Sequence, residues 1–339
     1  MTKLSPARAA FPLVPGLDPM HRGKVCDTYD LGNDLLLPVV SDGLSVHDFV
    51  LNTLVPDKGY ALNAMKVAMF RLLELKGIKT HLVDAGAAID EHLPRRLRGN
   101  ADLERRALVV RKLAMITVPY EGTEVGVEIV IRNCMTPGAR KYWKALGMTD
   151  EAEAYAHLQD GDAFPEPICT PTTKSETGHD VPIPLELLAY THPQALEMCM
   201  CANELESSYL KACGIKLADG KFEVGIDSDG VYRIGDETGT SDCCRLWSLT
   251  DWKLSRALRV RSMPVGLDKQ PARDWAASAG IDKLDPENPE HVARAHAILV
   301  PSKLVARLSS TYRGITEKVT GFTVREYATH VLGVKLEVL

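Results

Sequence analysis

LADGKFEVGIDSDGVYRIGDE, residues 217–237, has the pattern of a β-hairpin that carries many charged side chains. β-Branched and aromatic residues indicate one strand in KFEVGI and a second in VYRIGD, and the residues of DSDG indicate a turn between them. A four-residue turn sets the register of the two strands. It predicts that Lys221 lies opposite Asp236 and that Glu223 lies opposite Ile234.

The predicted hairpin has two different faces because side chains alternate along a strand. One face holds Asp219, Lys221, Glu223 and Asp236, and the other holds Phe222, Val224 and Gly235. The charged face has two interpretations. It is either a solvated surface, where a lysine–acid pair contributes at most about 1 kcal/mol, or a site for a divalent metal. Mg²⁺ prefers carboxylate oxygens and is commonly shared with nucleotide phosphates.

The composition is that of an ordinary globular protein and excludes several classes of function. With 339 residues, of which 45% are hydrophobic and 25% charged, the chain is long enough for about two domains. The net charge of −5 provides no basic surface for nucleic acid, so we expect small-molecule substrates. Because we find neither an apolar run of membrane-spanning length nor a signal peptide, we expect no membrane partner and a cytoplasmic location. The eight cysteines form no CxxC pair and are expected to be reduced thiols.

The remaining pattern predicts an α+β fold, with strands and helices in groups and not in strict alternation. An apolar stripe predicts a helix over 61–77, and Gly77 ends it. Residues 149–186 are rich in Pro, Thr, Asp and Gly and are expected to form a long irregular loop. Further strands are expected over 35–40, 80–84, 107–113 and 125–133, and further helices over 138–147, 193–212 and, beyond residue 249, over 251–260, 271–280 and 289–316.

Neither a Walker A sequence nor a GxGxxG fingerprint occurs in the chain. Residues 22–51 instead begin with a Gly-Lys pair, followed by a strand, an acidic turn and a second strand. Such a segment can place backbone N–H groups and one ammonium over phosphates.

Several segments, taken in order along the chain, resemble the family of phosphoribosylaminoimidazole-succinocarboxamide (SAICAR) synthases from purine biosynthesis. Their order and spacing extend the resemblance over nearly the whole chain. The segments are RGKVCDTYDLG, SDGLSVHD, VRKLAMITVPYEGTEVGVEIVIRN, TPTTKSETGHD, LADGKFEVG, IGDETGTSDCCRLW, DKQPARDW and YRGITEKVTG.

The resemblance implies an α+β fold of two mixed subdomains on antiparallel sheets, with an ATP cleft between them and a helical C-terminal part. We expect an N-terminal subdomain over 1–115 with a phosphate-covering loop, and a central subdomain over 116–260 with the metal and acceptor sites. A helical segment over 261–339 is expected to pack on the central subdomain.

The implied reaction uses ATP and Mg²⁺. ATP phosphorylates the carboxylate of the aminoimidazole ribonucleotide CAIR, and the amine of L-aspartate then displaces phosphate to give SAICAR. An enzyme of this type is an ATP-dependent carboxylate–amine ligase. Its partners are small-molecule substrates, and its state as a monomer or homo-oligomer is left open.

The resemblance also implies roles for individual residues. Glu223 and Asp236 are implied to hold Mg²⁺ on the ATP phosphates, and Lys221 to contact the transferring group, which makes these three the expected catalytic residues. Asp219 either supports this site or is structural. The residues implied in ATP binding are Lys24, Lys112, Met115, Glu128 and Lys221. Arg132 and Arg245 are implied to clamp the 5′-phosphate of the substrate, and the rest of the acceptor site is implied to consist of Asp48, Lys174, His179, Asp180 and Lys269.

The chain departs from the family pattern around the acceptor pocket. The family usually reads GKVRD, SDRISAFD, TGS and DSSR where this chain has Cys26, Gly43 with His47, Gly138, and Cys244. Two functions are compatible with these departures. The first is a SAICAR synthase in which other contacts replace the lost ones, and the second is a paralogous amide ligase that acts on a different carboxylate in specialised or phage nucleotide metabolism. A nucleotide-binding protein without catalysis is disfavoured, because the three expected catalytic residues remain.

Overall fold

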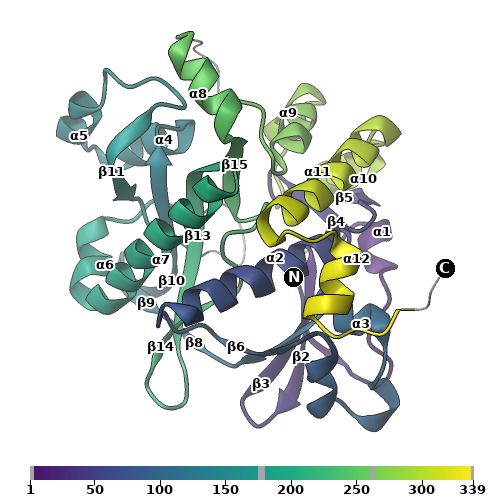
Figure 1. Cartoon of the computed structure of the whole chain (residues 1–339). Helices are drawn as coiled ribbons and strands as arrows, with labels where there is room; N and C mark the ends of the chain where they lie inside the picture. The colour runs from purple at the N-terminus through teal and green to yellow at the C-terminus, as the bar shows by residue number, and fades with distance from the viewer. Residues whose placement is uncertain (1–3, 175–179, 260–263, 337–339) are drawn as a thin grey trace. The chain divides into compact units, whose positions relative to one another are not determined.

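The computed structural model describes residues 4–174, 180–259 and 264–336 (Figure 1). The chain divides into two units. The first comprises Met1–Phe70, His81–Lys112 and Lys269–Leu339, and the second comprises Arg71–Thr80 and Leu113–Asp268. Each unit combines antiparallel strands with helices, which confirms the predicted α+β class. Within the described residues, we find no helix with the length and apolar character needed to cross a membrane.

The first unit contains a five-stranded antiparallel sheet, and its strands confirm those predicted over 35–40, 80–84 and 107–113. The strand order is β1 (Pro19–Arg22), β2 (Cys26–Gly32), β3 (Leu35–Val40), β7 (Leu108–Arg111) and β6 (Leu82–Ala85). Alternate residues of these strands, including Tyr29, Leu37 and Val109, are buried in one apolar cluster. Short helical segments accompany the sheet: α1 (Pro6–Ala9), η1 (Gly86–Glu91), η2 (Arg95–Leu97) and α3 (Ala101–Arg106).

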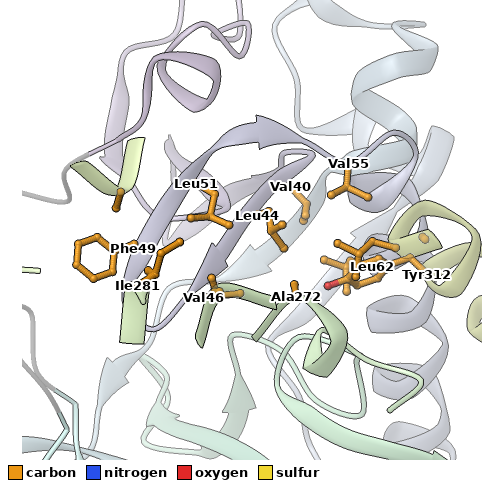
Figure 2. Close-up of a cluster of buried hydrophobic side chains, with 14 of the residues drawn as sticks. Val40, Leu44, Val46, Phe49, Leu51, Val55, Leu62, Ala272, Ile281 and Tyr312 are labelled. Carbon is orange, nitrogen blue, oxygen red and sulfur yellow. The ribbon is translucent and has the colours of Figure 1, made fainter. Parts of the chain in front are cut away.

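A second core in the first unit joins N-terminal strands to C-terminal helices (Figure 2). The hairpin of β4 (Gly43–Val46) and β5 (Phe49–Leu54) contributes Leu44 and Leu51, and helix α2 (Lys58–Leu75) contributes Leu62. The C-terminal helices contribute Ala272 and Tyr312. These helices are α9 (Gln270–Ser278), α10 (Pro289–Ala297) and α11 (Ser302–Thr320), followed by the short α12 (Val324–Glu326) and η4 (Tyr327–Val331).

This core corrects the expectation that the segment 261–339 packs on the central subdomain. The part of it that begins at Lys269 belongs to the first unit, because its apolar stripe is buried against β4 and β5. The helix predicted over 289–316 is also two helices. Pro301 lies between them, and proline both lacks the N–H that a helix needs and disfavours helical backbone at the preceding residue.

The second unit is built on an eight-stranded antiparallel sheet with two 12-residue strands at its centre, β10 (Thr123–Cys134) and β13 (Ile215–Ile226). Helix α7 (Pro193–Ala212) packs along both of them (Figure 1) and matches the helix predicted over 193–212. Strands β9 (Thr117–Tyr120), β11 (Ala163–Cys169) and β12 (Thr172–Thr173) pair with β10, and strands β8 (Ala114–Met115), β14 (Tyr232–Gly235) and β15 (Cys244–Ser248) pair with β13. Helices α4 (Pro137–Leu146) and α8 (Leu249–Ala257) complete the unit.

The long irregular loop expected over 149–186 is wrong for most of its described residues. The segment contains α5 (Thr149–Ala154), β11, β12 and the start of α6 (Leu185–Thr191). Pro165 and Pro167 obscure β11 in the sequence, because proline cannot donate to a neighbouring strand. They are tolerated because β11 ends the strand order, and an edge strand needs hydrogen bonds on one side only.

Candidate active site

A β-bulge at Ala218 determines which side chains of β13 face the charged side of the sheet. Leu217 pairs with Leu246 of β15, whereas Asp219 pairs with Arg245, so β13 has one extra residue between these pairs. The extra residue reverses the alternation of side chains along the strand. As a result, Asp219, Lys221 and Glu223 lie on one side of the sheet, and Ile215, Leu217, Phe222 and Val224 lie on the other.

The register of the hairpin differs by one residue from the predicted register. Glu223 pairs with Gly235, where Ile234 was expected. The turn has five residues because Oδ1 of Asp227 accepts hydrogen bonds from the backbone N–H groups two and four residues later, at 3.0 and 2.9 Å. Gly235 therefore faces the charged side of the sheet, contrary to the prediction.

Asp236 nevertheless lies beside Lys221. Strand β14 ends at Gly235, and Asp236 has a φ of +50°, a conformation that is uncommon for residues other than glycine. The left-handed conformation interrupts the alternation of the strand. Oδ2 of Asp236 is 3.8 Å from Nζ of Lys221 as a result. Backbone conformations of this kind cluster at functional sites.

Lys221 is surrounded by carboxylates. Its Nζ donates to Oε1 of Glu128 and to Oε1 of Glu223, both at 2.8 Å. Glu223 also pairs with Nζ of Lys174. Burial opposes the charge on Lys221, but Glu223, Asp236 and Glu128 raise the pKa of the ammonium well above its ordinary value. Lys221 is therefore a permanent cation within a group of carboxylate oxygens.

The oxygens of Glu223 and Asp236 have the chemistry of ligands for a hard cation. The side chain of Glu223 is 2% exposed and that of Asp236 is 46% exposed, so the pair reaches from the sheet to solvent. In the described part of the chain, no three or more His, Cys, Asp or Glu side chains gather into a complete metal site. Mg²⁺ does not require one, because it is commonly held by one or two carboxylates and takes its other ligands from phosphates and water.

Two arginines share one carboxylate on the same side of the sheet. Nη1 of Arg132 and Nη1 of Arg245 donate to Oδ2 of Asp219, at 3.0 and 2.8 Å. Burial lowers the pKa of Arg132, and Asp219 opposes the shift, so the guanidinium stays charged. Nε of Arg245 is buried and has no hydrogen-bond partner among the described residues. Two guanidinium groups with one carboxylate have an excess of positive charge that can bind an anion.

Of the two positions that depart from the family's serines, Gly138 adjoins Arg132, and Cys244 directly precedes Arg245 in β15. A Cβ atom at Gly138 would lie 2.8 Å from Nη1 of Arg132, so the guanidinium occupies the space of a side chain at 138. Cys244 is 5% exposed, and its Sγ is 3.6 Å from Sγ of Cys243. The hydrogen bond with Cys243 and burial both raise the pKa of the Cys244 thiol.

Two threonines also contact Arg132 and were missed by the sequence reasoning. Nε of Arg132 donates to Oγ1 of Thr170 at 2.8 Å, and Nη1 donates to Oγ1 of Thr136 at 3.2 Å. A signal for both was available. Thr136 is the first residue of the TPG segment at which the chain departs from the family, and Thr170 begins TPTTKSETGHD.

The first unit holds four of the expected site residues. Nζ of Lys24 pairs with Oδ1 of Asp48 at 2.6 Å, and both side chains are exposed. Lys112 follows β7 and is exposed, and Lys269 directly precedes α9. The remaining expected residues are in the second unit: Met115 and Asp180 are exposed, and His179 lies outside the described residues.

Comparisons with known proteins identify the family of this chain. The family model for SAICAR synthetase matches residues 19–286. The phosphoribosylaminoimidazole-succinocarboxamide synthase of Salinispora arenicola is 33% identical over 309 residues, which cover 89% of this chain and 98% of the relative. That of Thermobifida fusca is 32% identical over 318 residues, which cover 91% of this chain and 93% of the relative.

Solved structures show the same fold. SAICAR synthase from Saccharomyces cerevisiae, complexed with SAICAR, matches with a TM-score of 0.71 and 26% identity, covering 92% of this chain and 97% of that chain. A SAICAR synthetase in complex with ADP matches with a TM-score of 0.59 and 24% identity, covering 89% of this chain and 98% of that chain. At this level of identity, the likeness shows a common fold and nothing further.

Proposed function

Because the chain belongs to the SAICAR synthetase family, we propose that it is an ATP-dependent ligase that joins L-aspartate to the carboxylate of CAIR and so forms SAICAR in purine biosynthesis. The observation that carries the proposal is the arrangement on one side of the sheet in the second unit. Lys221 lies among three carboxylates, and Arg132 and Arg245 lie on the same side around Asp219.

The reaction has two steps. A carboxylate oxygen of the acceptor attacks the γ-phosphorus of ATP, the bond to the bridging oxygen breaks, and ADP leaves. The amine of L-aspartate then attacks the acyl carbon, loses a proton and expels phosphate as the amide bond forms. Both steps depend mainly on positioning and on neutralisation of charge, which suits a site built from lysines, arginines and carboxylates.

The residues of the hairpin act on the phosphates. Glu223 and Asp236 would hold Mg²⁺, which neutralises phosphoryl oxygens when bound. Lys221 would keep its proton and direct its ammonium at the transferring group. The other residues proposed for ATP are Lys24, Lys112, Met115 and Glu128.

The arginine pair would bind the 5′-phosphate of the acceptor. Arg132 and Arg245 supply the positive charge, while Gly138 and Cys244 supply none of the hydroxyl donors that serines would. A hydrogen bond to a charged group contributes roughly 1.5–3 kcal/mol, and a thiol is a poorer donor than a hydroxyl. We therefore expect the phosphate to be held more weakly than in family members with both serines.

L-Aspartate is the proposed amine, because the segment TPTTKSETGHD is almost complete in this chain. Lys174 and His179 would supply the two cations that a dicarboxylate needs, and Asp180 of the same segment is also proposed for this region. Asp48 and Lys269 are proposed for the same acceptor region.

A second candidate function is an amide ligase for a different carboxylate. The observation that favours it is the contact between Gly138 and Arg132, because the guanidinium lies where the family's serine would project. A pocket with this arrangement is able to fit an acceptor of another shape.

The test measures ADP release and the mass of the product with ATP, Mg²⁺, L-aspartate and CAIR. We expect SAICAR, with loss of turnover when EDTA removes the metal or when any one substrate is omitted. Faster turnover of another carboxylate than of CAIR would favour the second candidate. Equal turnover with glycine or alanine would overturn the assignment of aspartate, and no ATP turnover with any carboxylate of a panel would overturn both candidates.

A further inference from the structure

We infer that Arg8 is a positioning residue for the Gly23–Lys24 turn and takes the place of the arginine that the family has at position 43. The inference rests on the proposed function, because the Lys24 turn is where the chain would cover the phosphates of ATP. Arg8, Gly23, Lys24, Asp27 and Gly43 all belong to the first unit.

Arg8 is completely buried although it is charged. It lies in α1, which is tied to β5: Oγ of Ser5 donates to the backbone oxygen of Leu51 at 2.8 Å, and Oδ1 of Asn52 accepts from the backbone N–H of Ala7 at 2.9 Å. An arginine is buried at this cost only when it is paired and hydrogen-bonded. The fixed position of α1 therefore directs the Arg8 side chain toward specific partners.

The partners of Arg8 are the two ends of the β1–β2 turn. Nη2 and Nη1 donate to the two carboxylate oxygens of Asp27, at 2.6 and 3.2 Å, in a bidentate pair. Nη2 also donates to the backbone oxygen of Gly23 at 3.3 Å. The turn is closed from inside by a hydrogen bond of 2.8 Å from the N–H of Gly23 to the oxygen of Cys26. Arg8 thus holds the backbone directly before Lys24.

The absence of a side chain at Gly43 leaves space for an arginine that projects from α1. A Cβ atom at Gly43 would lie 3.0 Å from Cδ of Arg8 and 3.4 Å from the backbone oxygen of Lys24. The Arg8 side chain therefore fills the space next to Gly43, beneath the turn. In the family pattern SDRISAFD, an arginine would start from this same position. A side chain that starts at 43 would meet Cδ of Arg8, so the inferred exchange predicts that the two arginines are not accommodated together.

Arg22 provides a matched control. It pairs with the same Asp27, through Nε at 3.1 Å and Nη2 at 3.3 Å, but its other hydrogen bonds go to the oxygens of Ala9 and Phe11 and not to Gly23. Either arginine keeps Asp27 paired when the other is removed. Variants at Arg8 and Arg22 therefore lose the same type of ion pair, and only those at Arg8 release the turn.

The experiment compares Arg8→Met, Arg22→Met and Arg8→Lys by calorimetric binding of ADP with Mg²⁺, by the KM values for ATP and L-aspartate, and by thermal unfolding. We expect Arg8→Met to weaken ADP binding and raise the KM for ATP by about tenfold, the effect of one lost charged hydrogen bond. The KM for L-aspartate should stay unchanged. Arg22→Met should lower the unfolding temperature to a similar extent and move ADP binding little, and Arg8→Lys should be intermediate.

The reciprocal test is Gly43→Arg. In the wild-type background it should weaken ADP binding because it clashes with Arg8, and in the Arg8→Met background it should restore it. Equal effects of Arg8→Met and Arg22→Met on ADP binding would show that Arg8 is merely structural, and failure of the double variant to recover would overturn the exchange of arginines. ADP binding needs no acceptor, so these outcomes stand apart from a failure to form SAICAR.

Discussion

Arg132 is held by neighbours on several sides. Thr170, Thr136 and Asp219 accept its hydrogen bonds, and Gly138 leaves the space in which its guanidinium lies. A buried guanidinium with this many partners has one favourable position. The geometry of the anion site therefore depends on a residue that has no side chain.

We predict that Gly138→Ser raises the KM for the acceptor several-fold and leaves the KM for ATP unchanged. The new Cβ would lie 2.8 Å from Nη1 of Arg132, so the guanidinium must move away from Thr136 and Asp219. Gly314→Ser is the control, because nothing lies within 4 Å of a Cβ there. A lower KM for CAIR in Gly138→Ser would instead show that the serine supplies a lost phosphate contact.

Glu206 of α7 is a buried acid with an incomplete set of partners. Oγ1 of Thr238 donates to its Oε1 at 2.5 Å, and its Oε2 has no hydrogen-bond partner in the described part of the chain. Burial raises the pKa of Glu206 to about 8, against the opposing effect of the Thr238 hydrogen bond. The folded protein therefore holds this proton at neutral pH, whereas the unfolded chain releases it.

We predict that this proton makes stability depend on pH. The folded-state pKa of Glu206 lies above the unfolded value, so its contribution is complete below the unfolded pKa and is lost as pH rises through the folded pKa near 8. Urea unfolding between pH 5 and 8.5 should show a fall in the free energy of unfolding that Glu206→Gln flattens. Glu204→Gln, at an exposed position of the same helix, should keep the wild-type slope. An unchanged slope in Glu206→Gln would contradict the prediction.

At the scale of elements, the β13–β14 hairpin combines a buried acid, an exposed acid and a lysine within one short segment. Long paired strands fix Glu223 and Lys221, and the left-handed Asp236 closes the group from the end of β14. The hairpin therefore holds the carboxylate of Glu223 in a buried, fixed position and leaves the carboxylate of Asp236 accessible to solvent.

We predict that Glu223→Gln and Asp236→Asn each lower turnover by about a hundredfold or more when ATP and Mg²⁺ are below saturation, because metal stabilisation of phosphoryl oxygens is worth several kcal/mol. Steady-state ADP release over a series of Mg²⁺ concentrations measures the effect. Asp229→Asn, on the exposed turn of the same hairpin, should behave as wild type. Wild-type rates in Glu223→Gln or in Asp236→Asn would refute the assignment of these two residues as metal ligands.

The hairpin also shows which features of the site the sequence pattern could predict and which it could not. Alternation correctly predicted that Asp219, Lys221 and Glu223 share a face, but the register was wrong because a side chain, Asp227, closes a longer turn through hydrogen bonds that composition does not reveal. The bulge was visible in principle, since the apolar residues change from odd to even positions at Ala218. The pairing of Arg132 and Arg245 with Asp219 joins three strands. The sequence brought the two arginines together only through the family resemblance, and it did not predict that Asp219 pairs with both.

At the scale of the whole molecule, the C-terminal helices share a hydrophobic core with elements from the N-terminal part of the chain. Helices α9 to α11 complete the core that β4, β5 and α2 start (Figure 2). Helical periodicity predicted that these C-terminal segments are helices with a buried side. It could not tell which surface covers that side, because an apolar stripe is equally suited to any apolar partner.

We predict that Leu308→Ala lowers the free energy of unfolding by about 2–5 kcal/mol, the usual cost of removing a buried leucine side chain. Leu308 is fully buried in this core, whereas Leu299 is 82% exposed between α10 and α11. Leu299→Ala should therefore have almost no effect in the same denaturation experiment. Equal effects of the two variants would show that the C-terminal helices do not share the core.

The extra residue at Ala218 also has a consequence for how this strand can change during evolution. Substitutions at 218 leave the number of residues in β13 unchanged, so the extra position between the two pairs remains. A deletion would restore regular pairing with β15 and turn either the acids and the lysine, or Ile215 and Leu217, to the wrong side. Descendants of this chain should therefore keep the number of residues between 215 and 223, and gaps in their alignment should fall elsewhere, such as in the turn at 227–231.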